Sequence, residues 1–325
     1  MADTVRRFGE QFSWQPQVEN ADRLGAHDRF VVCGMGGSHL GAWLLERYGG
    51  TQDTITIHRD YGLPRGASGA LVILSSFSGE TEEVLDAANA ARAAGLPMAA
   101  VSVGGSLLAF AREHGIPYIK IPDTTLEPRL AIGFSMLALA RLMGNEPLEA
   151  LVRAAGLAAD PEARREEGLA LGQRLIGYIP WVWASAQNDV LAYIWKIKFN
   201  ESGKIPASWA TLPEACHNDL TGFDVVEATA ELTHRVQVVM LADESDHPRV
   251  GRRMDIARDV LSEKGMATAT VAVRASQAIP GAEGFAKAFD AAILADWAAI
   301  ALSGHYKVPN PETPLIAEFK RRLLD

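Results

Sequence analysis

The sequence is poor in cysteine. Among its 325 residues, only Cys33 and Cys216 are cysteines, too few for a framework of disulfide bonds. The chain has 8 histidines, but no His-x-x-x-His or Cys-x-x-Cys spacing, so no metal site is predicted. Cys216 directly precedes His217. Because adjacent residues rarely face each other and no helix start lowers the pKa of this thiol, we interpret Cys216 as structural.

The sequence also lacks an excess of positive charge and a long uninterrupted apolar run. The formal net charge is −9, which argues against binding to nucleic acids or membrane surfaces, because these partners are polyanions. The N-terminus "MADTVRRFGEQ" has no apolar signal core. The most apolar late stretch carries Asp290 and Asp296, which favours an amphipathic helix over a membrane span. We therefore expect a cytoplasmic protein that holds any anionic ligand locally.

Short β-rich runs alternate with helical patterns along the chain. This rhythm is typical of βαβ units, and it predicts parallel sheets covered by helices on both faces. A segment at 144–175 contains no strand pattern and is interpreted as a helical connection, so we expect two α/β domains, 1–150 and 151–325. The expected strands are 29–34, 54–59, 70–76, 98–103, 117–122, 180–185, 235–243 and 266–273; the expected helices of the first half are 40–48, 81–94, 106–113 and 129–143.

A glycine-rich turn, "VVCGMGGSHLGAW", connects the first expected strand to a helix. After Gly34 and Gly36, the third glycine of a dinucleotide fingerprint is replaced by His39, and no Gly-Lys-Ser/Thr ending is present. The spacing thus excludes a nicotinamide site and a P-loop. Two readings remain, a compact βα turn or a tight turn whose backbone approaches a ligand, with Ser38 at the helix start.

A second turn, "LSSFSGETEEV", places Ser76, Ser78 and Thr81 between a strand and a helix. Unpaired N–H groups and a partial positive charge at the helix N-terminus can hold a phosphate without a lysine or an arginine. Helix capping is the alternative reading, but one hydroxyl suffices for a cap. Glu80 is the first of the neighbouring carboxylates. We expect these side chains to point away from a bound phosphate, because like charges repel.

Three further residues are candidates for chemistry. Glu201 and His217 lie within a charged, helix-breaking segment at 198–220, and a carboxylate near an imidazole can serve general acid–base catalysis. A solvated loop glutamate is the alternative. Arg129 opens an apolar helix, where its charge opposes the helix dipole. This predicts an anionic partner, either a ligand or the carboxylate of a surface salt bridge.

Together these segments resemble the sugar-isomerase (SIS) domain superfamily, and more closely the bifunctional phosphoglucose/phosphomannose isomerases. The resemblance covers most of the chain. It implies two doubly wound SIS-type α/β domains, each a mainly parallel sheet flanked by helices. The segments that carry it are "GMGGSHLG", "SSFSGETEE", "PRLAIG", "NESGKIP", "CHNDLTGF" and "PETPLIAEFKRRL".

The resemblance also implies roles for individual residues. Glu201 matches the base that moves a proton between C1 and C2, and Arg129 matches the cation that steadies the enediolate. His217 and Lys320 match the ring-opening pair, with the histidine reaching in from the neighbouring subunit of an obligate homodimer. Thr313 matches a small residue that lets the family accept both C2 epimers. The resemblance implies that Ser76, Ser78 and Thr81 hold the sugar phosphate, with Gly37 and Ser38 lining the same pocket.

The expected function is therefore a cofactor-free aldose–ketose isomerase acting on glucose 6-phosphate, fructose 6-phosphate and mannose 6-phosphate. Glu80 stands where relatives carry Asn or Asp, and "NESGK" departs from Asn-Glu-Asn-x-Lys, which bears on substrate preference. Two alternatives remain: a non-catalytic SIS module that senses a sugar phosphate, and an isomerase of another phosphosugar.

Overall fold

The computed structural model describes residues 1–50, 52–124, 126–224, 229–310 and 312–323. The chain forms two compact units. The N-terminal unit contains Arg7–Ala159 and Gln277–Ala286, and the C-terminal unit contains Met1–Arg6, Asp160–Ser276 and Lys287–Asp325. The main division thus follows Ala159, whereas the sequence pattern predicted it after residue 150, which lies inside a helix, Glu146–Ala158.

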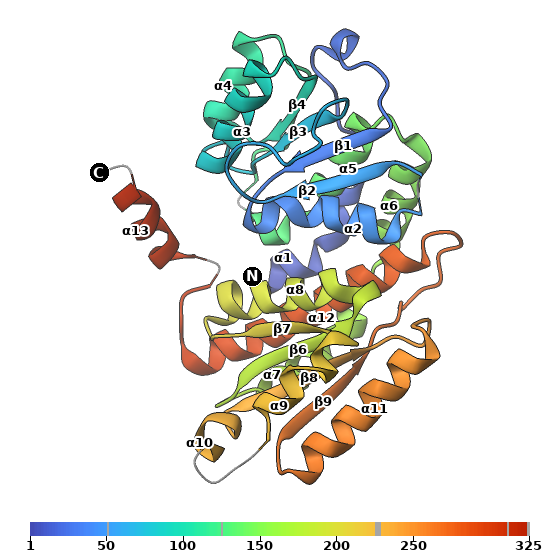
Figure 1. The fold of residues 1–325 in the computed structure, drawn as a ribbon, viewed down its shortest axis with the longest axis vertical. Coiled ribbons are helices and arrows are strands. Elements are labelled where there is room, and N and C mark those ends of the chain that lie inside the picture. Colours follow the sequence, from blue (N-terminus) through green and yellow to red (C-terminus); the bar gives the residue numbers. More distant parts are fainter. Residues whose placement is uncertain (51, 125, 225–228, 311, 324–325) are drawn as a thin grey trace. The chain divides into compact units, whose positions relative to one another are not determined.

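The N-terminal unit is built on a five-stranded, entirely parallel sheet with the order β2-β1-β3-β4-β5. Figure 1 labels the first four of these strands, β2, β1, β3 and β4. β3 is buried at every position, as its continuous apolar sequence requires in a parallel sheet covered on both faces. The strands are β1 (Arg29–Cys33), β2 (Thr54–His58), β3 (Leu71–Ser75), β4 (Met98–Ser102) and β5 (Tyr118–Lys120).

Helices cover both faces of this sheet. Alanines and leucines of α3 and α4 share a core cluster with strand residues such as Val72 and Leu74, while α2 and α5 pack against each other and contact the sheet (Figure 1). The helices are α2 (Leu40–Tyr48), α3 (Glu82–Ala93), α4 (Gly105–Glu113), α5 (Ile132–Leu142) and α6 (Glu146–Ala158).

The C-terminal unit is built on a four-stranded parallel sheet with the order β7-β6-β8-β9 (Figure 1). α11 packs on one face through Met254, Ala257 and Leu261, and α8 contacts β6 and β7. The strands are β6 (Ile179–Ser185), β7 (Ser208–Leu212), β8 (Val236–Ala242) and β9 (Ala267–Ala272). The helices are α1 (Ala2–Arg6), α7 (Arg165–Arg174), α8 (Asp189–Lys198), α9 (Asp219–Gly222), α10 (Ala230–Thr233), α11 (Pro248–Glu263), α12 (Glu283–Tyr306, shared with the other unit) and α13 (Pro314–Leu323).

The structure confirms the doubly wound α/β fold and every strand expected from the sequence, but it adds β7. This strand lies in the segment at 198–220 that the sequence predicted to be a loop. It is an edge strand, buried only at Leu212, so its sequence carries little of the apolar signal of an inner strand.

The apolar stretch around Asp290 and Asp296 forms α12, but the prediction of an amphipathic helix is wrong. Both aspartates are buried, at 2% and 3% exposure. Asp296 pairs with Lys198 at 2.6 Å, and Asp290 accepts a hydrogen bond from the Ser276 N–H. Among the described helices, none combines the length and the hydropathy that a membrane span requires.

Candidate active site

The candidate ligand site of the N-terminal unit lies where the order of the strands reverses. The chain steps from β1 to β2 on one side and then to β3 on the other side of β1. Ligands of doubly wound folds bind at such a switch point, beyond the carboxyl ends of the two strands. The two segments that follow β1 and β3 are the glycine-rich turn and the hydroxyl-rich loop Ser76–Thr81, which we name the phosphate loop after its expected ligand.

The two segments are joined through Ser38. The Ser38 carbonyl accepts a hydrogen bond from the Ser75 hydroxyl at 2.8 Å, and the Ser38 hydroxyl accepts one from the Phe77 N–H at 3.0 Å. A Cβ atom at Gly37 would lie 2.6 Å from the backbone nitrogen of Arg129. Gly37 therefore lets the backbone that carries Arg129 approach the turn closely.

Two of the three hydroxyl groups of the phosphate loop, those of Ser76 and Thr81, bond to each other, and Thr81 does not cap the helix. Thr81 occupies the N-cap position of α3 but makes no side-chain cap hydrogen bond; its hydroxyl bonds to that of Ser76 at 2.8 Å. Ser76 also accepts from the Gly79 N–H at 3.0 Å, and Ser78 accepts from the Glu80 N–H at 3.2 Å. Because the first N–H groups of a helix have no partner within it, this arrangement can bind an anion at the start of α3.

Arg129 lies in a short 3-10 turn, Pro128–Leu130, just before α5 rather than at the start of that helix as the sequence predicted. The arginine is 1% exposed. Its guanidinium lies 3.6 Å from a carboxylate oxygen of Glu127. The structure thus supplies an anionic partner from the protein itself.

Glu201 lies in the C-terminal unit, in a π-helical turn, Phe199–Gly203, that continues α8. Such turns widen a helix locally and occur often at functional sites. Lys204 ends the turn in the left-handed conformation, at φ 57°. The ammonium of Lys204 donates a 2.6 Å hydrogen bond to the Glu201 carbonyl and another to the Glu312 carbonyl. These bonds tie the turn to the segment that precedes α13.

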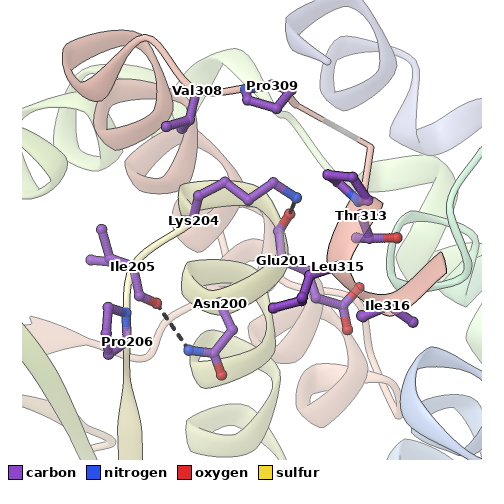
Figure 2. A pocket seen from close by; sticks show the side chains of 11 residues that line it. Asn200, Glu201, Lys204, Ile205, Pro206, Val308, Pro309, Thr313, Leu315 and Ile316 are labelled. Carbon is purple, nitrogen blue, oxygen red and sulfur yellow. Dashed lines mark hydrogen bonds between the residues drawn. The ribbon is translucent and has the colours of Figure 1, made fainter. Parts of the chain in front are cut away.

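Glu201 and Thr313 line one cavity of about 460 Å³ (Figure 2). Figure 2 shows the Glu201 carboxylate directed towards Leu315 and Ile316, with the Lys204 ammonium over the Glu201 backbone. The walls are mostly apolar, and volumes of this order are typical of small-molecule sites. The lining residues are Asn200, Glu201, Lys204, Ile205, Pro206, Val308, Pro309, Thr313, Pro314, Leu315 and Ile316.

Lys204 was not among the catalytic candidates of the sequence, although the spacing in "NESGK" places it one helical turn after Glu201. Lys320, which was a candidate, lies exposed on α13 and is not part of the cavity lining.

His217 does not meet Glu201 within the C-terminal unit. Glu201 precedes β7 and His217 follows it, at the carboxyl-terminal edge of the sheet. The five residues of β7 span roughly 15 Å and separate the two positions along the sheet. His217 is exposed. Next to it, burial raises the pKa of the Cys216 thiol, in agreement with a structural cysteine.

The switch point of the second sheet, between β6 and β8, has different chemistry. The Ser185 hydroxyl donates to Asp246 at 2.6 Å, and Lys287 pairs with Asp243 at 2.7 Å. These carboxylates would repel a phosphate dianion, so this crevice does not duplicate the phosphate loop. Among the described residues, no group of three or more His, Cys, Asp or Glu could hold a metal ion.

The predicted site residues therefore form two groups, one in each unit. Gly37, Ser38, the phosphate loop and Arg129 come together in the N-terminal unit. Glu201 and Thr313 come together in the C-terminal unit, where Lys320 and His217 lie outside their cavity.

Comparisons with known proteins agree with this architecture. The chain shares 32% identity with the bifunctional phosphoglucose/phosphomannose isomerase of Caldicellulosiruptor bescii, over 95% of both chains. It shares 28% identity with the protein of the same description from Aquifex aeolicus, over 98% of this chain and 97% of the relative. Among solved structures, a hypothetical protein from Thermus thermophilus superposes with a TM-score of 0.70 at 18% identity, covering 99% of this chain and 88% of the other.

The family model of the bacterial phosphoglucose isomerase C-terminal SIS domain matches residues 164–323. This range contains Glu201, His217, Thr313 and Lys320. The solved structure supports the fold alone, whereas the relatives match along almost the whole chain. The chain belongs to the family of bifunctional phosphoglucose/phosphomannose isomerases.

Proposed function

We propose that the protein is an aldose–ketose isomerase that interconverts glucose 6-phosphate, and also mannose 6-phosphate, with fructose 6-phosphate through a cis-enediol. One observation carries the proposal: a chain of this family combines the hydroxyl-rich phosphate loop at a switch point with a carboxylate, Glu201, in a cavity of sugar size. The loop supports a phosphorylated substrate, because α3 begins directly after it.

Glu201 acts as the base in this proposal. Its carboxylate removes the proton from C2 of the aldose and delivers it to C1. A proton moves from O2 to O1 in the same sequence, so the carbonyl shifts from C1 to C2 through the enediol. Because C2 is planar in that intermediate, protonation from either face yields glucose or mannose 6-phosphate. Thr313, on the wall of the same cavity, is the small residue that leaves room for both epimers.

Arg129 and two further residues complete the proposed mechanism. The buried guanidinium of Arg129 is a fixed positive charge that stabilises the developing enediolate, and such a preorganised charge costs no reorganisation during the reaction. His217 and Lys320 open the sugar ring by moving a proton between the ring oxygen and the anomeric hydroxyl.

The proposed enzyme is a homodimer with shared active sites that works in the cytoplasm. The separation of Glu201 and His217 by the length of β7 supports the dimer, since a site that uses both side chains needs His217 from a second copy. The two free cysteines, Cys33 and Cys216, suit a reducing compartment.

The first test is turnover of fructose 6-phosphate by the purified protein with EDTA present, with glucose 6-phosphate and mannose 6-phosphate measured separately. We expect both products. Glucose 6-phosphate alone would indicate a single-epimer enzyme. If neither forms while fructose 6-phosphate raises the Tm, the proposed activity on these three hexose phosphates is excluded, and a sugar-phosphate sensor or an isomerase of another phosphosugar remains.

The second test replaces the base. Glu201→Gln keeps the size of the side chain and removes its basicity, so we expect kcat to fall about a thousandfold with the Tm unchanged. Glu263→Gln is the matched control, because Glu263 is exposed near the end of α11, and it should retain full activity. Normal turnover by the Glu201→Gln protein would exclude Glu201 as the base.

A further inference from the structure

The phosphate loop contacts a second segment, which we call the support loop (Ser102–Leu107). It runs from the last residue of β4 into the first turn of α4. The Val103 N–H donates to the Phe77 carbonyl at 2.9 Å, and the Leu107 N–H donates to the Gly79 carbonyl at 3.0 Å. The hydroxyl of Ser102 adds a bond to the Phe77 carbonyl at 3.2 Å. The backbone of the phosphate loop is therefore anchored at two carbonyls, those of Phe77 and Gly79.

Two glycines allow the loops to approach so closely. Gly79 has φ +79°, and a Cβ atom there would lie 2.0 Å from the Gly104 carbonyl oxygen. Gly105 has φ +71°, and its Cβ atom would lie 2.6 Å from the Ser78 carbonyl oxygen. Both positions need glycine for conformation and for space. The relative position of the two loops is thus strongly constrained by backbone contact.

The Glu80 carboxylate adds a bidentate contact to this arrangement. One carboxylate oxygen accepts from the Ser106 N–H at 2.8 Å, and the other accepts from the Ser106 hydroxyl at 2.8 Å. Ser106 lies in the first turn of α4, where backbone N–H groups lack partners within the helix and favour a negative charge. Glu80 thus caps α4 from the neighbouring loop.

This contact explains how a glutamate is tolerated inside a loop that binds a dianion. The Glu80 charge is directed to the N-terminus of α4, while the loop hydroxyls lie at the start of α3. At the same residue, the Glu80 N–H donates to the Ser78 hydroxyl. The side chain and the backbone of Glu80 therefore link the orientation of Ser78 to α4.

We propose that Glu80 is a positioning residue that holds the phosphate loop in its ligand-binding conformation by capping α4 through Ser106. The proposal rests on the proposed function of the loop as the phosphate site. Preorganisation lowers the ordering cost that a ligand must overcome on binding. Loss of the contact therefore weakens binding of the phosphate group and leaves the proton-transfer step unchanged.

The test compares Glu80→Ala with Glu80→Gln. Alanine removes both hydrogen bonds, so we expect the KM for fructose 6-phosphate and the Ki of inorganic phosphate to rise about tenfold, with kcat within a factor of about two. Glutamine retains one acceptor for the Ser106 N–H and a donor for its hydroxyl. This variant should restore both constants to within about threefold of the wild-type values.

Two further variants complete the experiment. Ser106→Ala removes the partner hydroxyl and should raise the same two constants, by a smaller factor. Glu113→Ala removes an equal charge from the opposite end of α4 and should change neither.

Unchanged constants in Glu80→Ala, or failure of Glu80→Gln to restore them, would overturn the positioning role. If the wild-type protein binds neither inorganic phosphate nor fructose 6-phosphate, the proposed function fails, and this inference fails with it. If the wild type binds them and only the Glu80 variants depart from the expected constants, the inference alone fails, so the two failures are distinguishable.

Discussion

His39 shows how burial determines the charge of a single residue. It follows Ser38 in the glycine-rich turn and is fully buried, with its ring 5.9 Å from that of Trp43. Burial and the positive charge of Arg59 lower the pKa of His39 to about 4, although a backbone hydrogen bond with Gly36 acts in the opposite direction. The imidazole is therefore neutral in the folded protein at pH 7.

This shift predicts a pH dependence of stability. The pKa of His39 is about 4 in the folded state, against 6.5 for an ordinary histidine, so the unfolded chain binds more protons between these values and stability falls as the pH decreases through them. Between pH 7 and pH 5, the protonation of His39 in the unfolded chain lowers the free energy of unfolding by about 2 kcal/mol. Urea unfolding of the wild type and of His39→Gln at both pH values measures it. Equal pH dependence in the two proteins would contradict the prediction.

The buried pair of Lys198 and Asp296 gives a second prediction at the scale of residues. Asp296→Asn removes the carboxylate that lies 2.6 Å from the Lys198 ammonium, and breaking a buried ion pair from one side costs about 3 kcal/mol or more. Asp255→Asn, which breaks the exposed pair with Arg258, should cost less than about 1 kcal/mol. Urea unfolding measures the free energy of unfolding of both variants. Similar decreases relative to the wild type would refute the prediction.

At the scale of elements, a substitution in the glycine-rich turn tests how tightly the proposed phosphate site is packed. Gly37→Ala places a methyl group 2.6 Å from the backbone nitrogen of Arg129 and 2.7 Å from the carbonyl carbon of Pro128. Because backbone atoms move less easily than side chains, we expect the free energy of unfolding to fall by about 1–3 kcal/mol. Binding of fructose 6-phosphate should also be weaker.

Gly251→Ala is the control for this change. Gly251 lies in α11 with open space around its Cβ position, so the alanine should raise the free energy of unfolding by up to about 1 kcal/mol. Guanidinium unfolding of both variants measures the contrast. If Gly37→Ala is as stable as the wild type, the turn can shift, and the close approach is not a constraint.

The elements themselves differ in how far the sequence predicts them. The inner strands and the helices 40–48 and 106–113 follow from local apolar patterns and turn residues, and the structure confirms them. β7 does not follow, because an edge strand with one fully buried residue has no distinctive pattern of its own. Its strand conformation depends on pairing with β6, a contact between distant parts of the chain.

At the scale of the whole molecule, the proposed dimer predicts complementation between inactive subunits. In a mixed dimer of Glu201→Gln and His217→Ala chains, one site carries both substitutions and the other carries neither. Random exchange of equal amounts makes about half of the dimers mixed, so about one quarter of the wild-type activity should return. Turnover of fructose 6-phosphate after mixing and refolding measures it. If no activity returns although mass spectrometry shows mixed dimers, each site is contained within one chain.

The sequence by itself determined the local features of this protein: the α/β class, the hydroxyl-rich turn ahead of a helix, and the residues through which the chain resembles its family. These features depend on residues that are close together in the chain, because turn residues and apolar periodicity determine local conformation. Only the tertiary structure decided which segments meet. The order of the strands brings Ser38 to the phosphate loop, and the β4–α4 connection receives the Glu80 carboxylate. The parallel direction of β7 separates Glu201 from His217, because strand order and direction are set by packing between residues far apart in sequence.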